Sequence, residues 1–229
     1  MSNRYSKYQS PLAFIDMLFN MLVVFVFLFT IALLQIKKND DHPGVEMKAE
    51  FMITMTWPED TLDDIDLWLL LPDEKPCGFM FREVEYVTLD RDDTGGSSST
   101  NIVYDPGGGY KWIKSSREFM LIRSLQPGKY VVNVFVYRVI DEVLGFKSTT
   151  KLPYPVKVRL TKLNPRATDA VTQTVTVERL GQEKTAFTFR IDNQGNIVDV
   201  NTEEEHPFVP LGEVRKSRTN DSALGVEMP

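Results

Sequence analysis

The stretch Ser10–Ile36, with the sequence SPLAFIDMLFNMLVVFVFLFTIALLQI, decides how the rest of the chain is interpreted. From Met17 onward it runs for twenty residues without a formal charge, and its polar interruptions are Asn20, Thr30 and Gln35. A helix rises about 1.5 Å per residue, so about twenty apolar residues cross about 30 Å of hydrocarbon. The stretch therefore predicts one transmembrane helix over residues 10–36.

A cleaved signal peptide is the alternative, with Arg4 and Lys7 as its basic region. The apolar stretch is much longer than the usual signal core of about 7–15 residues, and no small-x-small cleavage site follows it. We therefore expect a retained anchor. Charge alone does not orient it, because Lys37 and Lys38 follow the span and nearly balance the basic residues before it. Single-span proteins with a large carboxy-terminal part commonly have a cytoplasmic N-terminus, so we expect residues 1–9 to form a cytoplasmic tail.

Asp16 is the anomaly of this predicted helix. A carboxylate in or near the membrane costs a few kcal/mol, and such residues usually face protein or water on an ion path. The alternative is a carboxylate at the interfacial end that snorkels to water and stabilises the helix N-terminus. At 100° per residue, one stripe contains Asp16, Asn20, Val23, Phe27 and Thr30. We expect this stripe to face a partner protein, since a lone span cannot shelter a carboxylate.

Composition excludes several other classes of function. The chain has 229 residues, a formal net charge of −6 and no basic cluster, so nucleic acid is not an expected partner. A single cysteine, Cys77, excludes an internal disulfide and a cysteine-rich zinc site. The histidines, His42 and His206, lie near segment ends and argue against a histidine metal site or catalytic triad. No catalytic constellation is visible, and we do not expect an enzyme.

The pattern changes from helical to extended after a charged linker over residues 37–48, which contains a Pro-Gly pair. Tyr130–Val139 is rich in β-branched and aromatic residues, and Val171–Val177 alternates apolar residues with threonine. Short strands at spacings of about 8–12 residues, separated by turn signals, predict an all-β immunoglobulin-like sandwich over residues 49–201. Residues 202–229 are acidic and then irregular, which indicates a flexible tail.

Three acids, Asp90, Asp92 and Asp93, follow one of the predicted strands. Calcium favours clustered carboxylate and carbonyl oxygens, so these acids are candidate calcium ligands. Their spacing is not that of an EF-hand loop, and a solvated acidic turn is the alternative. We expect no tightly bound cofactor apart from this candidate ion.

The segment Pro11–Leu18, PLAFIDML, followed by an apolar run, resembles the single span of the B subunits of ion-driven motors. These are MotB of flagellar stators, ExbD and TolR. The resemblance implies that Asp16 carries a proton or sodium ion, and that the N-terminus is cytoplasmic in a bacterial inner membrane. It also implies a homodimer of this chain inside a pentamer of a polytopic A subunit of the MotA, ExbB or TolQ type. The β-rich remainder departs from the family, whose domains are OmpA-like or small α/β domains.

Three other segments are similar to immunoglobulin-like extracellular domains of the YfaP type. They are DIDLWLLLP (Asp64–Pro72), LDRDDTGG (Leu89–Gly96) and SLQPGKYVVNVFVY (Ser124–Tyr137). This resemblance supports the fold more than any activity. The expected function is therefore a motor B subunit driven by proton or sodium motive force, whose β-domain couples force to an extracytoplasmic target. The alternative is a single-pass anchored β-sandwich that binds a ligand or an adhesive partner without ion transport.

Overall fold

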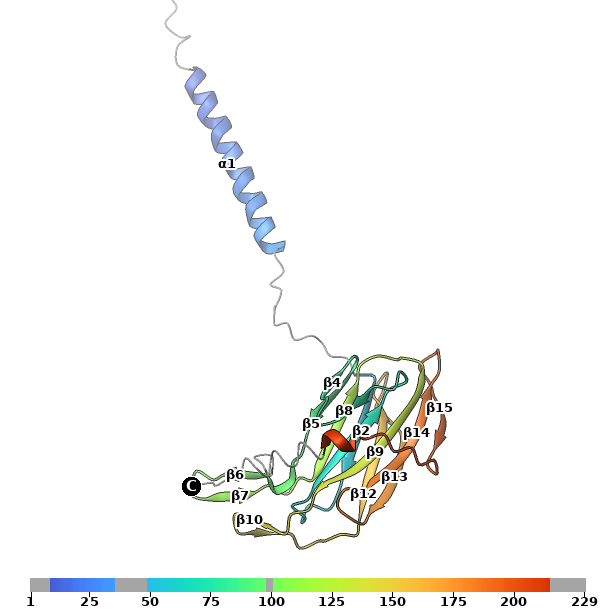
Figure 1. Ribbon diagram of the computed structural model, residues 1–229. Helices are drawn as coiled ribbons and strands as arrows, with labels where there is room; N and C mark the ends of the chain where they lie inside the picture. Colours follow the sequence, from blue (N-terminus) through green and yellow to red (C-terminus); the bar gives the residue numbers. More distant parts are fainter. Residues whose placement is uncertain (1–8, 36–48, 98–100, 215–229) are drawn as a thin grey trace, which may run out of the picture. The chain divides into compact units, whose positions relative to one another are not determined.

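The computed structural model describes residues 9–35, 49–97 and 101–214 (Figure 1). The chain divides into two compact units, Met1–Met47 and Lys48–Pro229. The first unit contains helix α1 (Gln9–Gln35). Within it, Leu12–Ile31 is long and apolar enough to cross a membrane, a property that a signal sequence near the N-terminus shares. The prediction of one N-terminal apolar helix followed by a mostly β unit is confirmed.

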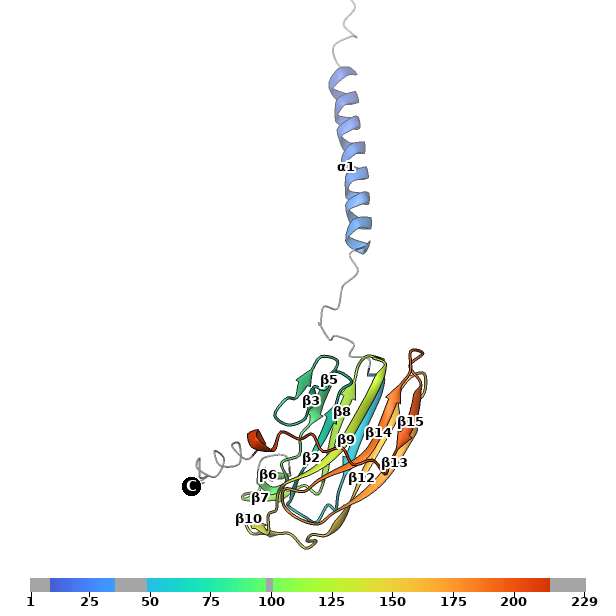
Figure 2. The same cartoon turned by 45° about the vertical axis from the view of Figure 1, so that its right-hand side comes forward.

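The second unit, called the β unit below, consists mainly of two antiparallel sheets (Figures 1 and 2). The first sheet has the order β13-β12-β1-β8-β5-β4 and the second has the order β15-β14-β9-β2-β3. The strands of the first sheet are β1 (Phe51–Thr56), β4 (Glu83–Val84), β5 (Val87–Arg91), β8 (Arg117–Ile122), β12 (Tyr154–Lys162) and β13 (Thr168–Val177). Those of the second are β2 (Asp64–Leu70), β3 (Pro76–Cys77), β9 (Gly128–Arg138), β14 (Glu183–Ile191) and β15 (Ile197–Asn201).

Alternation of apolar and polar residues explains why the two sheets share one core. In β12, the buried residues Val156, Val158 and Leu160 alternate with Lys157 and the partly exposed Arg159. Such a period of two places one face of a strand against the core and the other toward solvent. Inward residues of both sheets form one buried cluster, which includes members of β1, β2, β8, β9, β12 and β14.

Strand β1 lies in the middle of its sheet and is antiparallel to both neighbours. All six of its residues are in register with β12 on one side and with β8 on the other. Near its first residue, the Glu50 N–H donates to the carbonyl of Ile122 at 2.8 Å. Beyond its last residue, the Trp57 N–H donates to the carbonyl of Ser116 at 3.2 Å. These two bonds extend the pairing of β1 with β8 by one residue at each end.

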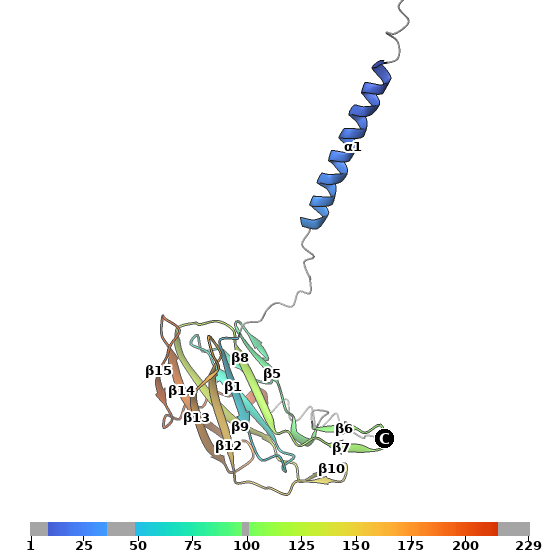
Figure 3. The same cartoon turned by 180° about the vertical axis from the view of Figure 1, so that it is seen from behind.

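Two small hairpins extend from one end of the β unit, the end at which β1 finishes (Figures 1 and 3). One consists of β6 (Ile102–Tyr104) and β7 (Tyr110–Trp112), and the other of β10 (Glu142–Val143) and β11 (Phe146–Lys147). A single 3-10 turn, η1 (Gly95–Ser97), lies between β5 and β6 in the sequence. The rings of Trp112 and Phe146 meet edge to face with centroids 6.1 Å apart, which joins the two hairpins.

Part of the predicted flexible tail packs on the outer face of the second sheet. Residues 202–214 follow β15, and their side chains Val209 and Val214 are buried in a second cluster with Trp68, Phe135 and Tyr137. The physical reason is that the outer faces of β2 and β9 carry large aromatic residues that need an apolar cover. The acids at positions 203–205 indicated a solvated tail, whereas the apolar run over residues 207–211, PFVPL, is the part that supplies contacts. Residues 215–229 of the predicted tail, the linker over 37–48 and residues 1–8 lie outside the described residues.

Val214→Asp is expected to release this segment from the sheet. Val214 is fully buried, and burying a carboxylate there is more costly than detaching the segment and hydrating it. We expect the free energy of unfolding to fall by about 1–3 kcal/mol. Limited proteolysis should then show new cleavage between residues 202 and 214. Leu211→Asp is the matched control, because Leu211 is 40% exposed. If both variants resist proteolysis equally well between residues 202 and 214, the docking of this segment on the second sheet is contradicted.

Candidate functional site

Asp16 is the eighth residue of α1, and its side chain is exposed. Asn20, Val23, Phe27 and Thr30 are exposed as well, on the same side of the helix. The Thr30 hydroxyl donates to the carbonyl of Val26 at 2.8 Å, so the helix itself satisfies this polar group. Among the residues that the structure describes, none donates a hydrogen bond to Asp16. Its carboxylate therefore needs water or a second protein.

The opposite side of α1 is apolar. Phe25 and Phe29 stack there with ring centroids 6.1 Å apart and an interplanar angle of 13°. Phe25 follows Asp16 by nine residues, which places the two residues on opposite sides of a helix. The helix therefore has one stripe that contains polar groups and an opposite face that is apolar.

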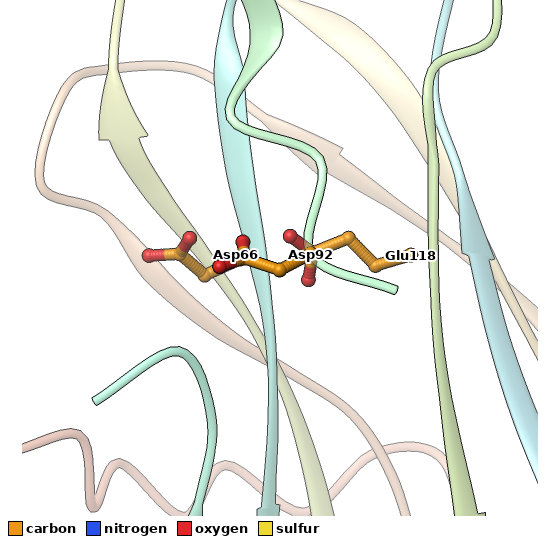
Figure 4. A group of neighbouring side chains, drawn as sticks. All are labelled: Asp66, Asp92 and Glu118. Carbon is orange, nitrogen blue, oxygen red and sulfur yellow. The ribbon is translucent and has the colours of Figure 1, made fainter. Parts of the chain in front are cut away.

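The β unit contains a group of three carboxylates (Figure 4). Asp66 comes from β2, Asp92 follows β5, and Glu118 comes from β8. One carboxylate oxygen from each residue lies within 4.8 Å of the other two. Glu118 is 0% exposed, Asp66 is 2% exposed, and Asp92 is partly exposed. In the part of the chain that the structure describes, this is the group of acidic, histidine or cysteine residues that could hold a metal ion.

The side chain of Glu118 joins the two sheets. It lies on the inward face of β8, in alternation with Met120 and Ile122, which belong to the core. Its Oε2 accepts a hydrogen bond from the Leu67 N–H of β2 at 2.7 Å, and its Oε1 accepts one from the Asp93 N–H at 3.1 Å. Strand β3 pairs with β2 only at Leu69 and Leu70. At Leu67, the Glu118 carboxylate therefore accepts the backbone hydrogen bond that a neighbouring strand would otherwise accept.

Burial raises the pKa of Glu118 well above its ordinary value, and the negative charges of Asp66 and Asp92 raise the pKa further. The hydrogen bond from the Leu67 N–H acts in the opposite direction and is the smaller effect. Glu118 therefore binds a proton more tightly in the folded protein than in the unfolded chain. Either a proton or a cation reduces the repulsion among the three carboxylates.

The structure places the three candidate calcium ligands in different surroundings. Asp92 joins the carboxylate group, and its buried Oδ1 has no hydrogen-bond partner among the described residues. Asp90 forms an ion pair with Arg123 at 3.3 Å.

Asp93 is fully buried and faces hydrogen-bond donors. Its Oδ1 accepts hydrogen bonds from the Gly95 N–H at 3.1 Å and from Asn101 Nδ2 at 2.6 Å. Its Oδ2 accepts one from the Arg117 N–H at 3.2 Å. This carboxylate therefore holds together the loop between β5 and β8, and it lies apart from the group of three carboxylates.

Sequence reasoning did not find Asp66 or Glu118. Within DIDLWLL, Asp66 alternates with the core residues Ile65 and Leu67, as a polar residue of a strand does. Within REFMLI, Glu118 stands at a position where the strand pattern calls for an apolar residue. An acid at such a position is the signal that was available, because a buried carboxylate needs partners. The two residues are distant in sequence, and only the packing of β2 against β8 brings them together.

The hairpins at the end of the β unit carry exposed aromatic residues. Tyr104 is 68% exposed, and its ring meets that of Tyr110 edge to face with centroids 6.3 Å apart. Lys114 Nζ lies 5.5 Å from the ring centroid of Trp112. Exposed tyrosine and tryptophan residues are enriched at binding surfaces, where one end of the ring is apolar and the other is polar.

No protein-family model, no curated protein and no solved structure matches this chain.

The stability of the β unit is expected to fall as the pH rises above about 4.5, the ordinary pKa of a glutamate. Glu118 has a raised folded-state pKa, so between its unfolded and folded pKa values the native state binds more protons and loses stability with rising pH. One such group contributes up to about 1.4 kcal/mol per pH unit. Thermal unfolding of the full chain in detergent and EDTA measures this slope.

Glu118→Gln is expected to reduce the slope, whereas Glu59→Gln, which removes an exposed carboxylate, is expected to leave it unchanged. An unaltered slope in Glu118→Gln would contradict the assignment. A divalent cation held by Asp66, Asp92 and Glu118 would offset most of their negative charge, so repeating the titration with calcium in place of EDTA tests whether this group, which shares only Asp92 with the predicted ligands, binds the ion.

Proposed function

We propose that this chain is the single-span B subunit of an ion-driven membrane motor, with Asp16 as the ion-accepting carboxylate. The observation that carries the proposal is one exposed carboxylate on an apolar helix of 27 residues. Carboxylates inside membrane spans are costly and usually mark ion or proton paths. A single helix cannot enclose such a path, so the proposal requires a partner that surrounds it.

Asp16 would alternate between a charged and a neutralised state in this motor. When a proton or sodium ion binds, the carboxylate loses its net charge and the helix can move along the apolar wall of its partner. When the ion leaves, the restored charge again favours a polar site. Asn20 lies one turn further along the same stripe and faces the same partner.

The topology that follows from the proposal has a cytoplasmic N-terminus in a bacterial inner membrane. The β unit, with an immunoglobulin-like arrangement of its two sheets, would then lie in the periplasm and couple force to an extracytoplasmic target. The partner is a pentamer of a polytopic subunit of the MotA, ExbB or TolQ type, around two copies of this chain. Apart from the transported ion, the proposal assigns no tightly bound cofactor.

A second candidate function is a membrane-anchored binding module without ion transport. The aromatic hairpins favour it, because Tyr104 and Tyr110 are exposed and Trp112 is partly exposed at one end of the β unit. In this case Asp16 would snorkel to the membrane surface, and its charge would serve only the helix. The two candidates differ in what Asp16 does.

Asp16→Asn is expected to abolish ion flux while leaving expression and assembly intact, because asparagine keeps the shape of the side chain and cannot ionise. Flux is measured in membrane vesicles from the host organism, with a pH-sensitive or sodium-sensitive dye. Phe25→Leu is the matched control, since it changes an apolar residue on the opposite side of α1 and should retain flux. Normal ion flux in Asp16→Asn would contradict the motor proposal.

Purification from host membranes in a mild detergent is expected to yield two copies of this chain with five copies of one polytopic protein. Native mass spectrometry measures this stoichiometry directly. Because an Asp16 carboxylate without a partner is costly in lipid, the complex should survive extraction. Recovery of the chain without any multi-span partner would instead support the anchored binding module.

A further inference from the structure

The two main sheets of the β unit have four edges, and three of them are protected. An open edge presents unpaired N–H and C=O groups, and natural proteins protect it with short strands, charges, proline or bulges. Strand β3 has two residues and begins at Pro76, and β4 has two residues and begins at Glu83. Strand β15 has five residues and contains Asp199, which has a positive φ of 51° and an ion pair with Arg190 at 3.2 Å.

The fourth edge, β13, has none of these protections over most of its length. It has ten residues and is hydrogen-bonded in its sheet to β12 alone. Residues 170–177, AVTQTVTV, contain no charge and no proline. Thr172, Thr174 and Thr176 are exposed, whereas Val171 and Val177 are buried. A long uncharged edge of high β propensity is a template for pairing with another strand.

We propose that the outer edge of β13 pairs with β13 of a second copy of this chain, antiparallel and centred on Thr174. A two-fold axis through this residue places Thr172 of one copy opposite Thr176 of the other. It also places Val171 opposite Val177, whereas Gln173 faces Val175 between these pairs. Contact between the same strand of two copies is the isologous geometry that closes a dimer.

Charges at the ends of β13 fit this register. Asp169 lies near the start of the strand, beside a register shift of the β12–β13 ladder, and forms an ion pair with Arg159 of the same copy at 3.3 Å. Arg179 lies just after the end of the strand, and both residues are exposed. The two-fold axis brings Asp169 of each copy to the end of the ladder where Arg179 of the other copy lies. It keeps the two Asp169 carboxylates at opposite ends of the interface. Opposite charges across a strand pair stabilise it, and like charges directly opposite would destabilise it.

The inference deepens the proposed function, on which it rests for the presence of two copies in one complex. It names the surface of the β unit through which these copies join, and its argument uses no property of Asp16. A test on β13 can therefore fail without affecting the test of ion flux.

Site-specific crosslinking of the full chain in membranes tests the proposal. The native cysteine, Cys77, is fully buried, and burial raises the pKa of its thiol to about 12, so it does not compete in oxidation. Thr174→Cys places two added thiols opposite each other at the two-fold axis. Facing residues of antiparallel strands have Cα atoms about 4.5–5.5 Å apart, within the range of a disulfide. Mild oxidation is expected to convert most of this variant to a covalent dimer.

Two neighbouring variants are matched controls on the same strand. In the proposed register, Thr172→Cys alone separates the two thiols by about 13 Å along the strands and should not crosslink. The same holds for Thr176→Cys alone. Co-expression of these two variants with different tags should crosslink one to the other. Val200→Cys on the protected edge β15 should give no covalent dimer.

Absence of the Thr174→Cys dimer, or equal crosslinking at positions 172, 174, 176 and 200, would overturn the proposal. Crosslinking is also measured in the Asp16→Asn background, where the same result is expected because the edge does not depend on ion binding. If Thr174→Cys fails to crosslink while Asp16-dependent flux persists, the dimer surface is wrong and the motor proposal stands. If crosslinking succeeds without any Asp16-dependent flux, the motor proposal fails and the edge pairing stands.

Discussion

Two backbone N–H groups from separate parts of the β unit converge on one buried carboxylate. Leu67 belongs to the second sheet and Asp93 to the loop after β5, and both donate to Glu118 on β8 of the first sheet. A buried N–H without an acceptor costs free energy comparable to a lost hydrogen bond. The arrangement therefore depends on an acid at a position where a core residue would otherwise be apolar. It ties the two sheets together at the end from which the hairpins emerge.

Much of the fold could be predicted from local patterns. Helix α1 was evident because its apolar run exceeds what a soluble helix needs, and β12 and β13 were evident because a period of two survives in their sequences. The short strands β3, β6 and β10 were not evident. Two or three residues show no period, and such strands form because tertiary contacts hold them in register.

The candidate sites also differ in whether the sequence alone reveals them. Asp16 could be found because a single charge within an apolar run is a local anomaly. The carboxylate group could not, because Asp66 and Glu118 meet only when two sheets pack. The docking of residues 202–214 was also hidden, since the apolar residues Phe208, Val209 and Val214 follow neither the period of a helix nor that of a strand. Few contacts suffice there because the aromatic face of the second sheet already supplies most of the apolar surface.

The position of β1 determines how the β unit responds to tension. The chain enters the unit at the first residue of this strand, and the hairpins lie beyond its last residue. A pull between these two ends runs along the strand axis and loads the hydrogen bonds to β12 and β8 in shear. Both ladders extend over all six residues of β1, so their bonds must break together. An edge strand pulled sideways would peel away one pair at a time. The first strand after the N-terminal helix is thus an interior strand of this sheet, held on both sides against extraction.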